Sequence, residues 1–145
     1  MVKINQAESS KRYPRIVENI KVKNYNNIGK SETVYYQSPT KVVVVGENII
    51  ETMVALGLEK KILLAVTYGN KQYQPLPEHE LSYRAIKIAS NLALTSENIL
   101  ELEPDLIVSG QQLFSDKRLK DTQFWQNRGV NTFLSSNANS PFKHE

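Results

Sequence analysis

Four polar segments, three of which contain glycine, follow the apolar runs of this sequence, and they hold the residues best suited to bind a ligand. Their members are Gly46-Glu47-Asn48, Thr67-Tyr68-Gly69, Gly110-Gln111-Gln112 and Ser136-Asn137. Each follows a short apolar run of the kind typical of a strand buried on both faces. In a parallel sheet such segments gather outside the carboxyl ends of the strands, where ligands bind. The sequence therefore predicts one binding edge.

Aromatic side chains are the leading ligand candidates at this edge. Tyr68 and Tyr73 each combine an aromatic body with a hydroxyl tip, which suits a flat, partly apolar ligand such as a catecholate or a tetrapyrrole. The alternative is that both tyrosines simply pack over a loop. The other candidates offer amide, carboxylate or backbone groups to the rim of a ligand: Gln111, Gln112, Glu47 and Gly69.

Two further positions bear on the charge and shape of the site. An anionic ligand needs cations, and Lys71 and Arg84 are the nearest by sequence, although lysines are mostly solvated. Asn48 precedes Glu51 by three residues, which is the capping-box spacing. Asn48 is therefore better assigned to a helix cap than to the ligand, although it stays among the candidates.

Enzymatic and metal-binding patterns are missing from the sequence. It has no cysteine, and its two histidines, His79 and His144, are isolated from other metal ligands. No G-x-G-x-x-G follows Val45, and neither a Walker A sequence nor a G-x-S-x-G elbow occurs. Met53 falls on the apolar face of a predicted helix and is assigned to the core. We therefore predict a protein that is not an enzyme and holds no metal or cofactor of its own.

Bulk composition narrows the class of protein further. The chain has 145 residues, of which 40% are hydrophobic, enough for one domain with a real core. Its net charge of +3 comes from scattered lysines, whereas nucleic-acid binding typically needs clustered ones. No apolar run approaches the roughly 20 residues of a membrane span. We predict no nucleic-acid partner.

The order of elements predicts the fold. We expect a β-hairpin over 15–37, with its turn in the polar segment 24–30. The remaining strands are predicted at 42–45, 62–66, 106–109 and 130–135, with a short extended piece at 86–88. Helices are predicted from Asn48 to the residue before Gly57, at 77–85, at 96–102 behind a Thr95 cap, and from Ser115 or Asp116 to Arg128.

This alternation of strands and helices predicts an α/β protein, a three-layer sandwich with a mainly parallel central sheet and a preceding hairpin. We divide the chain into a disordered polar N-terminus (1–13), the hairpin and its lead-in (14–40), an α/β lobe (41–136) and a tail (137–145).

Four segments in this order resemble the substrate-binding proteins of ABC importers for iron-siderophores, haem and cobalamin. The segments are Pro39 to Val45 (PTKVVVV), Thr52 to Leu58 (TMVALGL), Ser96 to Val108 (SENILELEPDLIV) and Gly129 to Phe133 (GVNTF). The resemblance covers about 15–136. Members of that family have two α/β lobes joined by a long helix, so we expect this chain to be the N-terminal lobe, with the linking helix beginning at 137–145. A single lobe supplies only half of the binding cleft, so we expect it to bind the ligand weakly. Its exposed tyrosines could also allow two copies of the chain to associate.

The resemblance also implies a function, partners and a location. It implies capture of a ferric siderophore, which we favour over haem or cobalamin, followed by docking to an ABC permease in the membrane. Glu97, in the first turn of the helix before L-x-P-D, matches the acidic residue that docks on the permease; the alternative is compensation of the helix dipole. The implied location is extracytoplasmic, periplasmic or lipid-anchored, although this sequence shows neither a signal peptide nor an anchoring cysteine.

An alternative reading needs no transport ligand. The same α/β architecture also occurs in stand-alone regulatory or protein-interaction domains, which would use the strand-end edge for a protein partner.

Overall fold

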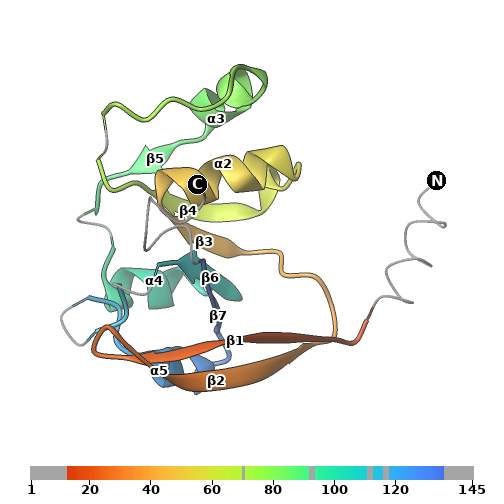
Figure 1. Ribbon diagram of the computed structural model, residues 1–145, viewed down its shortest axis with the longest axis vertical. Helices are drawn as coiled ribbons and strands as arrows, with labels where there is room; N and C mark the ends of the chain where they lie inside the picture. The colour runs from red at the N-terminus through yellow and green to blue at the C-terminus, as the bar shows by residue number, and fades with distance from the viewer. Residues whose placement is uncertain (1–12, 70, 92–93, 111–112, 116–117, 136–145) are drawn as a thin grey trace.

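The computed structural model describes residues 13–69, 71–91, 94–110, 113–115 and 118–135. It contains a two-stranded antiparallel hairpin and a five-stranded parallel sheet of order β5-β4-β3-β6-β7 (Figure 1). The hairpin strands are β1 (Arg15–Lys23) and β2 (Asn26–Tyr35). The sheet strands are β3 (Val42–Val45), β4 (Ile62–Val66), β5 (Ile88–Ala89), β6 (Leu106–Ser109) and β7 (Asn131–Leu134). In the described part of the chain, no helix has the length and apolar character needed to cross a membrane.

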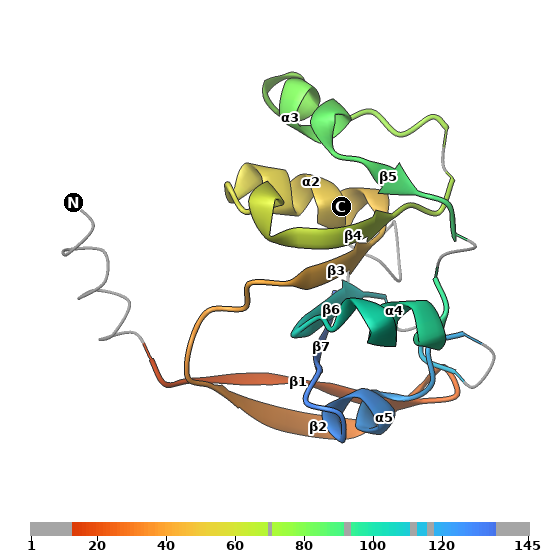
Figure 2. The same cartoon turned by 180° about the vertical axis from the view of Figure 1, so that it is seen from behind.

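Alternate valines of the central strand β3 point into two separate cores. Val42 and Val44 pack with α2 (Glu47–Ala55) and with Tyr83 of α3 (Glu80–Ala85). Val43 and Val45 pack on the other face, with Ile99 of α4 (Ser96–Leu102) and Trp125 of α5 (Thr122–Gln126). The sheet therefore lies between two helical layers, which confirms the predicted three-layer α/β sandwich (Figure 2).

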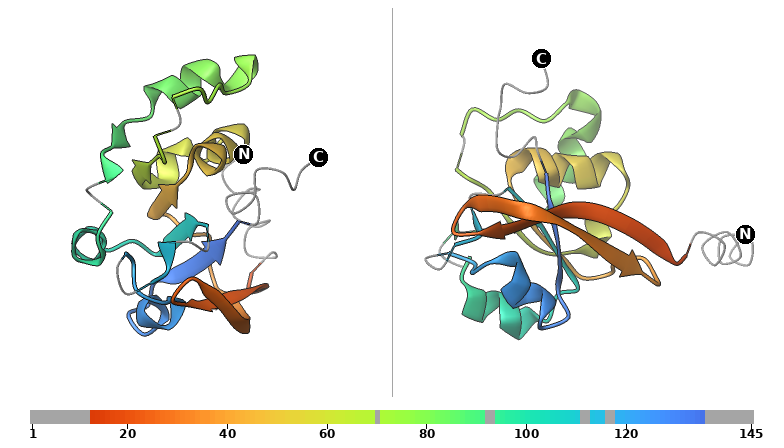
Figure 3. Two further views of the ribbon diagram at one scale, coloured as in Figure 1. Left: turned by 60° about the vertical axis from the view of Figure 1, so that its left-hand side comes forward. Right: turned by 60° about the horizontal axis from the view of Figure 1, so that its bottom comes forward.

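The hairpin lies against the face of the sheet that α5 covers, and directed hydrogen bonds fix its position (Figure 3). Val22 of β1 is fully buried in the core, and its N–H donates to Thr122 Oγ1 at 3.1 Å. The Leu134 N–H of β7 donates to Asn19 Oδ1 at 2.9 Å, and the Tyr25 N–H donates to the Phe114 carbonyl at 2.9 Å. The hairpin is thus joined to the sheet by burial and by polar contacts.

Asp105 fixes the chain where it leaves the hairpin and enters β3. Its carboxylate accepts hydrogen bonds from Thr40 N–H at 2.9 Å, Thr40 Oγ1 at 3.2 Å and Lys41 N–H at 3.1 Å. Asp105 immediately precedes β6, the neighbour of β3, so these contacts hold the amino ends of two adjacent strands together.

The predicted capping box of α2 is wrong. The helix begins at Glu47, its N-cap is Gly46, and no side chain caps it. Gly46 has φ 117°, a conformation that side chains disfavour and glycine accepts readily. The chain can therefore turn from strand to helix at once, which puts Asn48 inside the helix and leaves Glu51 free for other partners.

Two predicted boundaries also need correction. The last helix was predicted to start at Ser115 or Asp116, but α5 starts at Thr122 behind the Asp121 cap, which accepts from Phe124 N–H at 2.8 Å. Before it, Lys120 adopts a left-handed φ of 68°, and Leu119 N–H bonds the Leu113 carbonyl, so a compact turn replaces the expected helix. The hairpin turn is confined to positions 24 and 25, both with positive φ, and the rest of 24–30 belongs to β2.

The remaining predicted elements are confirmed, with small shifts at their ends. The short helix η2 (Pro77–His79) leads directly into α3, as expected for 77–85. Thr95 caps α4 by accepting from Asn98 N–H at 3.1 Å. One further short helix, η1 (Glu59–Lys61), precedes β4.

Thr122→Val should destabilise the fold by about 1–3 kcal/mol, because it removes the acceptor of the buried Val22 N–H without changing the shape of the side chain. The free energy of unfolding in urea measures this cost. Thr33→Val, on the half-buried face of β2, is the matched control and should stay within about 0.5 kcal/mol of the parent. Equal effects of both substitutions would show that this hydrogen bond does not hold the hairpin.

Candidate functional site

The carboxyl ends of the parallel strands meet at one edge of the molecule, as the sequence predicts. Gly46 N–H, after β3, donates to the Val66 carbonyl at the end of β4 at 2.8 Å. Ser135 N–H, after β7, donates to the Ser109 carbonyl at the end of β6 at 2.9 Å. These bonds hold the segments after the strands in fixed relative positions, so side chains there can form a common surface.

Glu47 is a buried carboxylate at this edge. Its side chain comes from the first residue of α2, only 6% of the residue is exposed, and its Oε1 accepts from Tyr68 N–H at 3.0 Å. A carboxylate is favoured there because the first turn of a helix presents unpaired N–H groups and the positive end of the helix dipole. Glu47 thus holds the start of the loop after β4 against α2.

Tyr68 lies across the carboxyl edge of the sheet. It follows β4, and its side chain accepts a hydrogen bond from the Gly110 backbone beyond β6, so it passes over the end of β3. A Cβ atom on Gly46 would lie 3.1 Å from Tyr68 Cε2, so glycine makes room for the ring. Tyr68 is 43% exposed, and it therefore offers a surface as well as filling space.

The surroundings of Tyr68 keep its hydroxyl protonated at neutral pH. Burial raises the pKa of Tyr68 above its ordinary value, and the negative charge of Glu47 acts in the same direction. The Gly110 hydrogen bond and the positive charge of Arg118 oppose this shift without cancelling it. Tyr68 is thus a neutral hydrogen-bonding group, and Arg118 is a cation near it that the sequence analysis did not single out.

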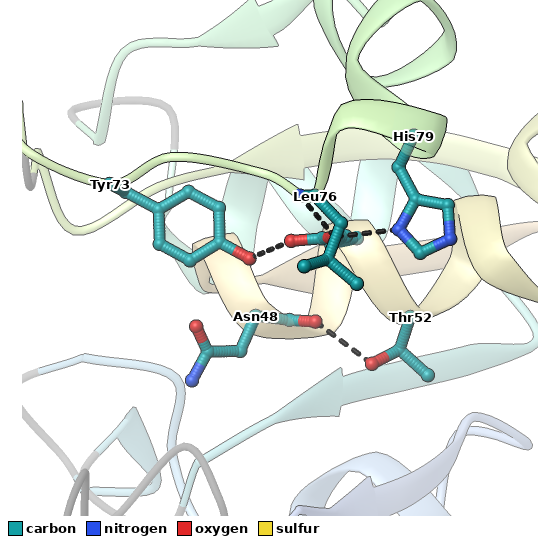
Figure 4. Close-up of polar contacts among 6 residues, drawn as sticks. Asn48, Thr52, Tyr73, Leu76 and His79 are labelled. Carbon is teal, nitrogen blue, oxygen red and sulfur yellow. Dashed lines mark hydrogen bonds and ion pairs between the residues drawn. The ribbon is translucent and has the colours of Figure 1, made fainter.

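Beside the edge, the carboxylate of Glu51 on α2 holds three groups of the 67–79 loop (Figure 4). The Tyr73 hydroxyl donates to Glu51 Oε1, Leu76 N–H donates to Oε2 at 2.9 Å, and His79 Nδ1 lies 2.6 Å from Oε2. The Glu51 side chain is 12% exposed and the His79 side chain 18%. We call this arrangement the Glu51 clasp.

The clasp changes the acidity of its members. Burial raises the pKa of Glu51, but the hydrogen bonds from Tyr73, His79 and the Leu76 N–H outweigh burial and leave that pKa below its ordinary value. Burial, reinforced by the adjacent Glu51 carboxylate, raises the pKa of Tyr73 far above its ordinary value. At neutral pH, therefore, the clasp consists of an ionised carboxylate and a neutral tyrosine.

A hollow of about 470 Å³ lies over the clasp, between α2 and the loop. Asn48 and Thr52 of α2 line it together with members of the clasp. The Thr52 hydroxyl donates to the Asn48 carbonyl at 2.9 Å, so it is used within the helix. Tyr73 also contacts Tyr83 of α3, with ring centroids 5.8 Å apart. Tyr73 is thus mainly a packing group that anchors the loop.

The structure divides the predicted ligand residues into groups. Glu47, Tyr68 and Gly69 come together at the carboxyl edge, while Asn48 and Tyr73 lie along α2. Arg84 sits on the last turn of α3, ahead of β5, in an exposed pair with Glu80 at 3.4 Å. Figure 1 places α3 away from the end toward which the strand arrows point. Gln111 and Gln112 lie outside the described residues.

Glu97 occupies the exposed first turn of α4, as predicted. Its own backbone N–H and the Ser96 hydroxyl, which donates to Oε1 at 3.0 Å, hold its pKa below the ordinary value. The side chain is therefore an ionised, accessible carboxylate.

Sequence reasoning missed the Glu51 clasp because its partners are 22 to 28 residues away along the chain. A usable signal existed, however. A loop with tyrosine and histidine follows β4, and it must cross α2 to reach α3. Among the described residues, no group of three or more His, Asp or Glu side chains could hold a metal ion, and Met53 is buried in the core.

Glu51→Gln should release the loop, because an amide nitrogen at one Oε position faces donors instead of accepting from them. We expect a loss of about 1.5–3 kcal/mol in the free energy of unfolding. The pKa of Glu51 is lowered in the folded state, so its contribution is complete above the ordinary value of 4.5 and is lost as the pH falls through the lowered pKa. The difference between parent and variant should therefore shrink in acid.

Urea unfolding at neutral and at strongly acidic pH measures both effects. Glu80→Gln is the matched control, since its pair with Arg84 is exposed and should contribute little. A difference between parent and Glu51→Gln that stays constant from neutral to acid pH would contradict the clasp.

Comparisons with known proteins place this fold. No family model matches the chain, and no curated protein matches it. A periplasmic binding protein from Veillonella parvula superimposes with a TM-score of 0.70 and 27% identity over 86% of the chain. An ABC-type Fe³⁺-hydroxamate transport system protein from Saccharomonospora viridis superimposes with a TM-score of 0.56 and 18% identity over 84% of the chain. The chain spans 39% of the length of each. It is therefore similar in fold to one part, a single α/β lobe, of periplasmic binding proteins.

Proposed function

We propose that this chain is the solute-binding component, in its N-terminal lobe, of an extracytoplasmic ABC import system that captures a ferric siderophore and docks on a membrane permease. The observation that carries the proposal is the likeness to the Veillonella periplasmic binding protein over 86% of the chain at 27% identity. The Fe³⁺-hydroxamate transport protein, at 18% identity, supports the fold alone. Both neighbours are binding or transport proteins, which agrees with a protein that makes and breaks no bond.

The order of the matching segments gives independent support. The sequence segments that resemble the importer family are 39–45, 52–58, 96–108 and 129–133, and they fall on β3, α2, α4 with β6, and the entry to β7. These are the elements that build the central sheet and its carboxyl edge. The resemblance therefore concerns the part of the fold that positions Tyr68 and Glu47.

The carboxyl edge has the chemistry that a chelate requires of a protein. In a ferric siderophore the chelate itself saturates the iron, so the protein needs surface and hydrogen-bonding groups and no metal ligand. Tyr68 offers a half-exposed ring with a protonated hydroxyl. Arg118 supplies positive charge close to it, a better candidate than Arg84 for contact with an anionic chelate.

Tyr68→Phe should weaken binding of a ferric hydroxamate siderophore by about two- to tenfold, because one hydrogen bond to the ligand is lost while the ring remains. Quenching of tyrosine and tryptophan fluorescence on titration measures the affinity, with a ferric catecholate, haem and cobalamin as comparison ligands.

Tyr36→Phe is the matched control for this titration, because Tyr36 is 77% exposed beyond the end of β2, far along the chain from the edge. The Tyr36→Phe variant should bind the ferric hydroxamate with the same affinity as the parent. Binding by none of the four ligands, or equal affinities for all three proteins, would remove this edge from chelate binding.

Glu97→Ala should leave ligand affinity unchanged and lower transport severalfold, because an ionised, exposed carboxylate suits docking on a cationic surface. Uptake of labelled chelate by the complete importer is the measurement. Glu101→Ala, one turn further along α4, is the control. An unchanged uptake rate for Glu97→Ala would exclude this residue from docking.

A further inference from the structure

A second hollow lies at the sheet margin, away from the carboxyl edge. Its volume is about 580 Å³. Ile62, Leu63 and Leu64 of β4 form one wall, and Ala85, Ile86 and Lys87 form the other. We call it the β4–β5 slot. In Figure 2 the chain that leads from α3 into β5 runs apart from the first part of β4.

Within the described part of the chain, no other strand pairs with the outer edge of β4 along the slot. β5 is the outermost strand, and among the described residues it pairs with β4 only at Ala65 and Val66. On the other side of β4, the register with β3 passes from Ile62 to Leu64 and omits Leu63. Leu63 therefore belongs to neither ladder, and the residue is 37% exposed. Unpaired strand edges readily accept another chain in extended conformation.

A second, independent feature of the slot concerns charge. Glu59, in η1 at the amino end of β4, also lines it. Glu59 Oε2 is buried and has no hydrogen-bond partner in the described structure. A buried carboxylate oxygen without a donor is costly, and the outer torsion of a glutamate turns easily. This oxygen is therefore poised to accept from a donor that enters the slot.

We propose that the β4–β5 slot binds an extended polypeptide segment of a partner protein, with apolar side chains flanking one lysine or arginine. Its backbone pairs with β4 along Ile62 to Leu64, and the basic side chain reaches Glu59 Oε2. Three residues of strand span about 10 Å, so a short segment suffices. The slot walls are mainly aliphatic, which fits apolar flanking residues.

This site is independent of chelate capture at the carboxyl edge. It lies beside the first part of β4, whereas Tyr68 follows the last residue of that strand. Peptide binding in the slot is therefore measurable without the transport ligand.

The test uses the 145-residue chain and the blocked pentapeptide acetyl-Thr-Val-Lys-Val-Thr-amide. Saturable binding is followed by NMR at the Leu63 and Lys87 amides and by calorimetry. Replacing the peptide lysine by norleucine should weaken binding about tenfold, as should Glu59→Gln in the protein, and the two changes together should cost no more than either alone. N-methylation of the peptide backbone should abolish binding.

Glu78→Gln is the matched protein control, since Glu78 is an exposed glutamate of η2 outside the lining of the slot, and it should bind as the parent does. Circular dichroism of each variant verifies that it is folded. Three results would overturn the proposal: no binding of the pentapeptide at millimolar concentration, affinity unaffected by Glu59→Gln in a folded variant, or a slot occupied by a second copy of this chain, detected as concentration-dependent dimerisation by sedimentation.

Discussion

The structure depends on burial of β3 on both of its faces. Its four valines are at most 3% exposed, and it is the central strand of the sheet. A strand in this position must receive a helical layer on each side, because alternate side chains point to opposite faces. The two cores follow from this constraint, one closed by α2 and α3 and the other by α4 and α5. The candidate site lies just beyond the carboxyl end of this strand, where Gly46 turns the chain into α2.

Gly46, directly after β3, positions the main side chains of the candidate site. Its backbone conformation lets α2 begin immediately after β3, so the Glu47 carboxylate reaches the first residues after β4. The absence of a side chain at Gly46 also admits the Tyr68 ring. One residue thus positions both the carboxylate and the aromatic group of the edge. Glu51, one helical turn further along α2, fixes the rest of the same loop.

The parts of the fold that could be predicted from sequence are those with local causes. Strand β3 is a continuous apolar run because both of its faces are buried, and α4 has its Thr95 cap within three residues of the donor. The parts that could not be predicted have distant causes. Three buried residues before α5 lie outside any α-helix or strand, so no hydrophobic period in the sequence predicts their burial: Leu113, Phe114 and Leu119. The contacts of Asp105 with Thr40 and Lys41 join residues 64 and 65 positions apart.

The same distinction explains why the sequence predicts a shared edge at the strand ends but not the contacts formed there. Topology alone brings Glu47 and Tyr68 to one edge, since every parallel strand ends there. The cation near this edge is Arg118, which precedes α5 and acts on Tyr68. Arg84, which the sequence suggested, lies instead in the last turn of α3. The partners of Glu51 could not be predicted from sequence, because its spacing from Asn48 also fits a capping box. Because α2 begins at Glu47, Asn48 is not its cap, and Glu51 instead accepts from three groups of the loop. These hydrogen bonds hold the pKa of the Glu51 carboxylate below its ordinary value, although burial alone would raise it.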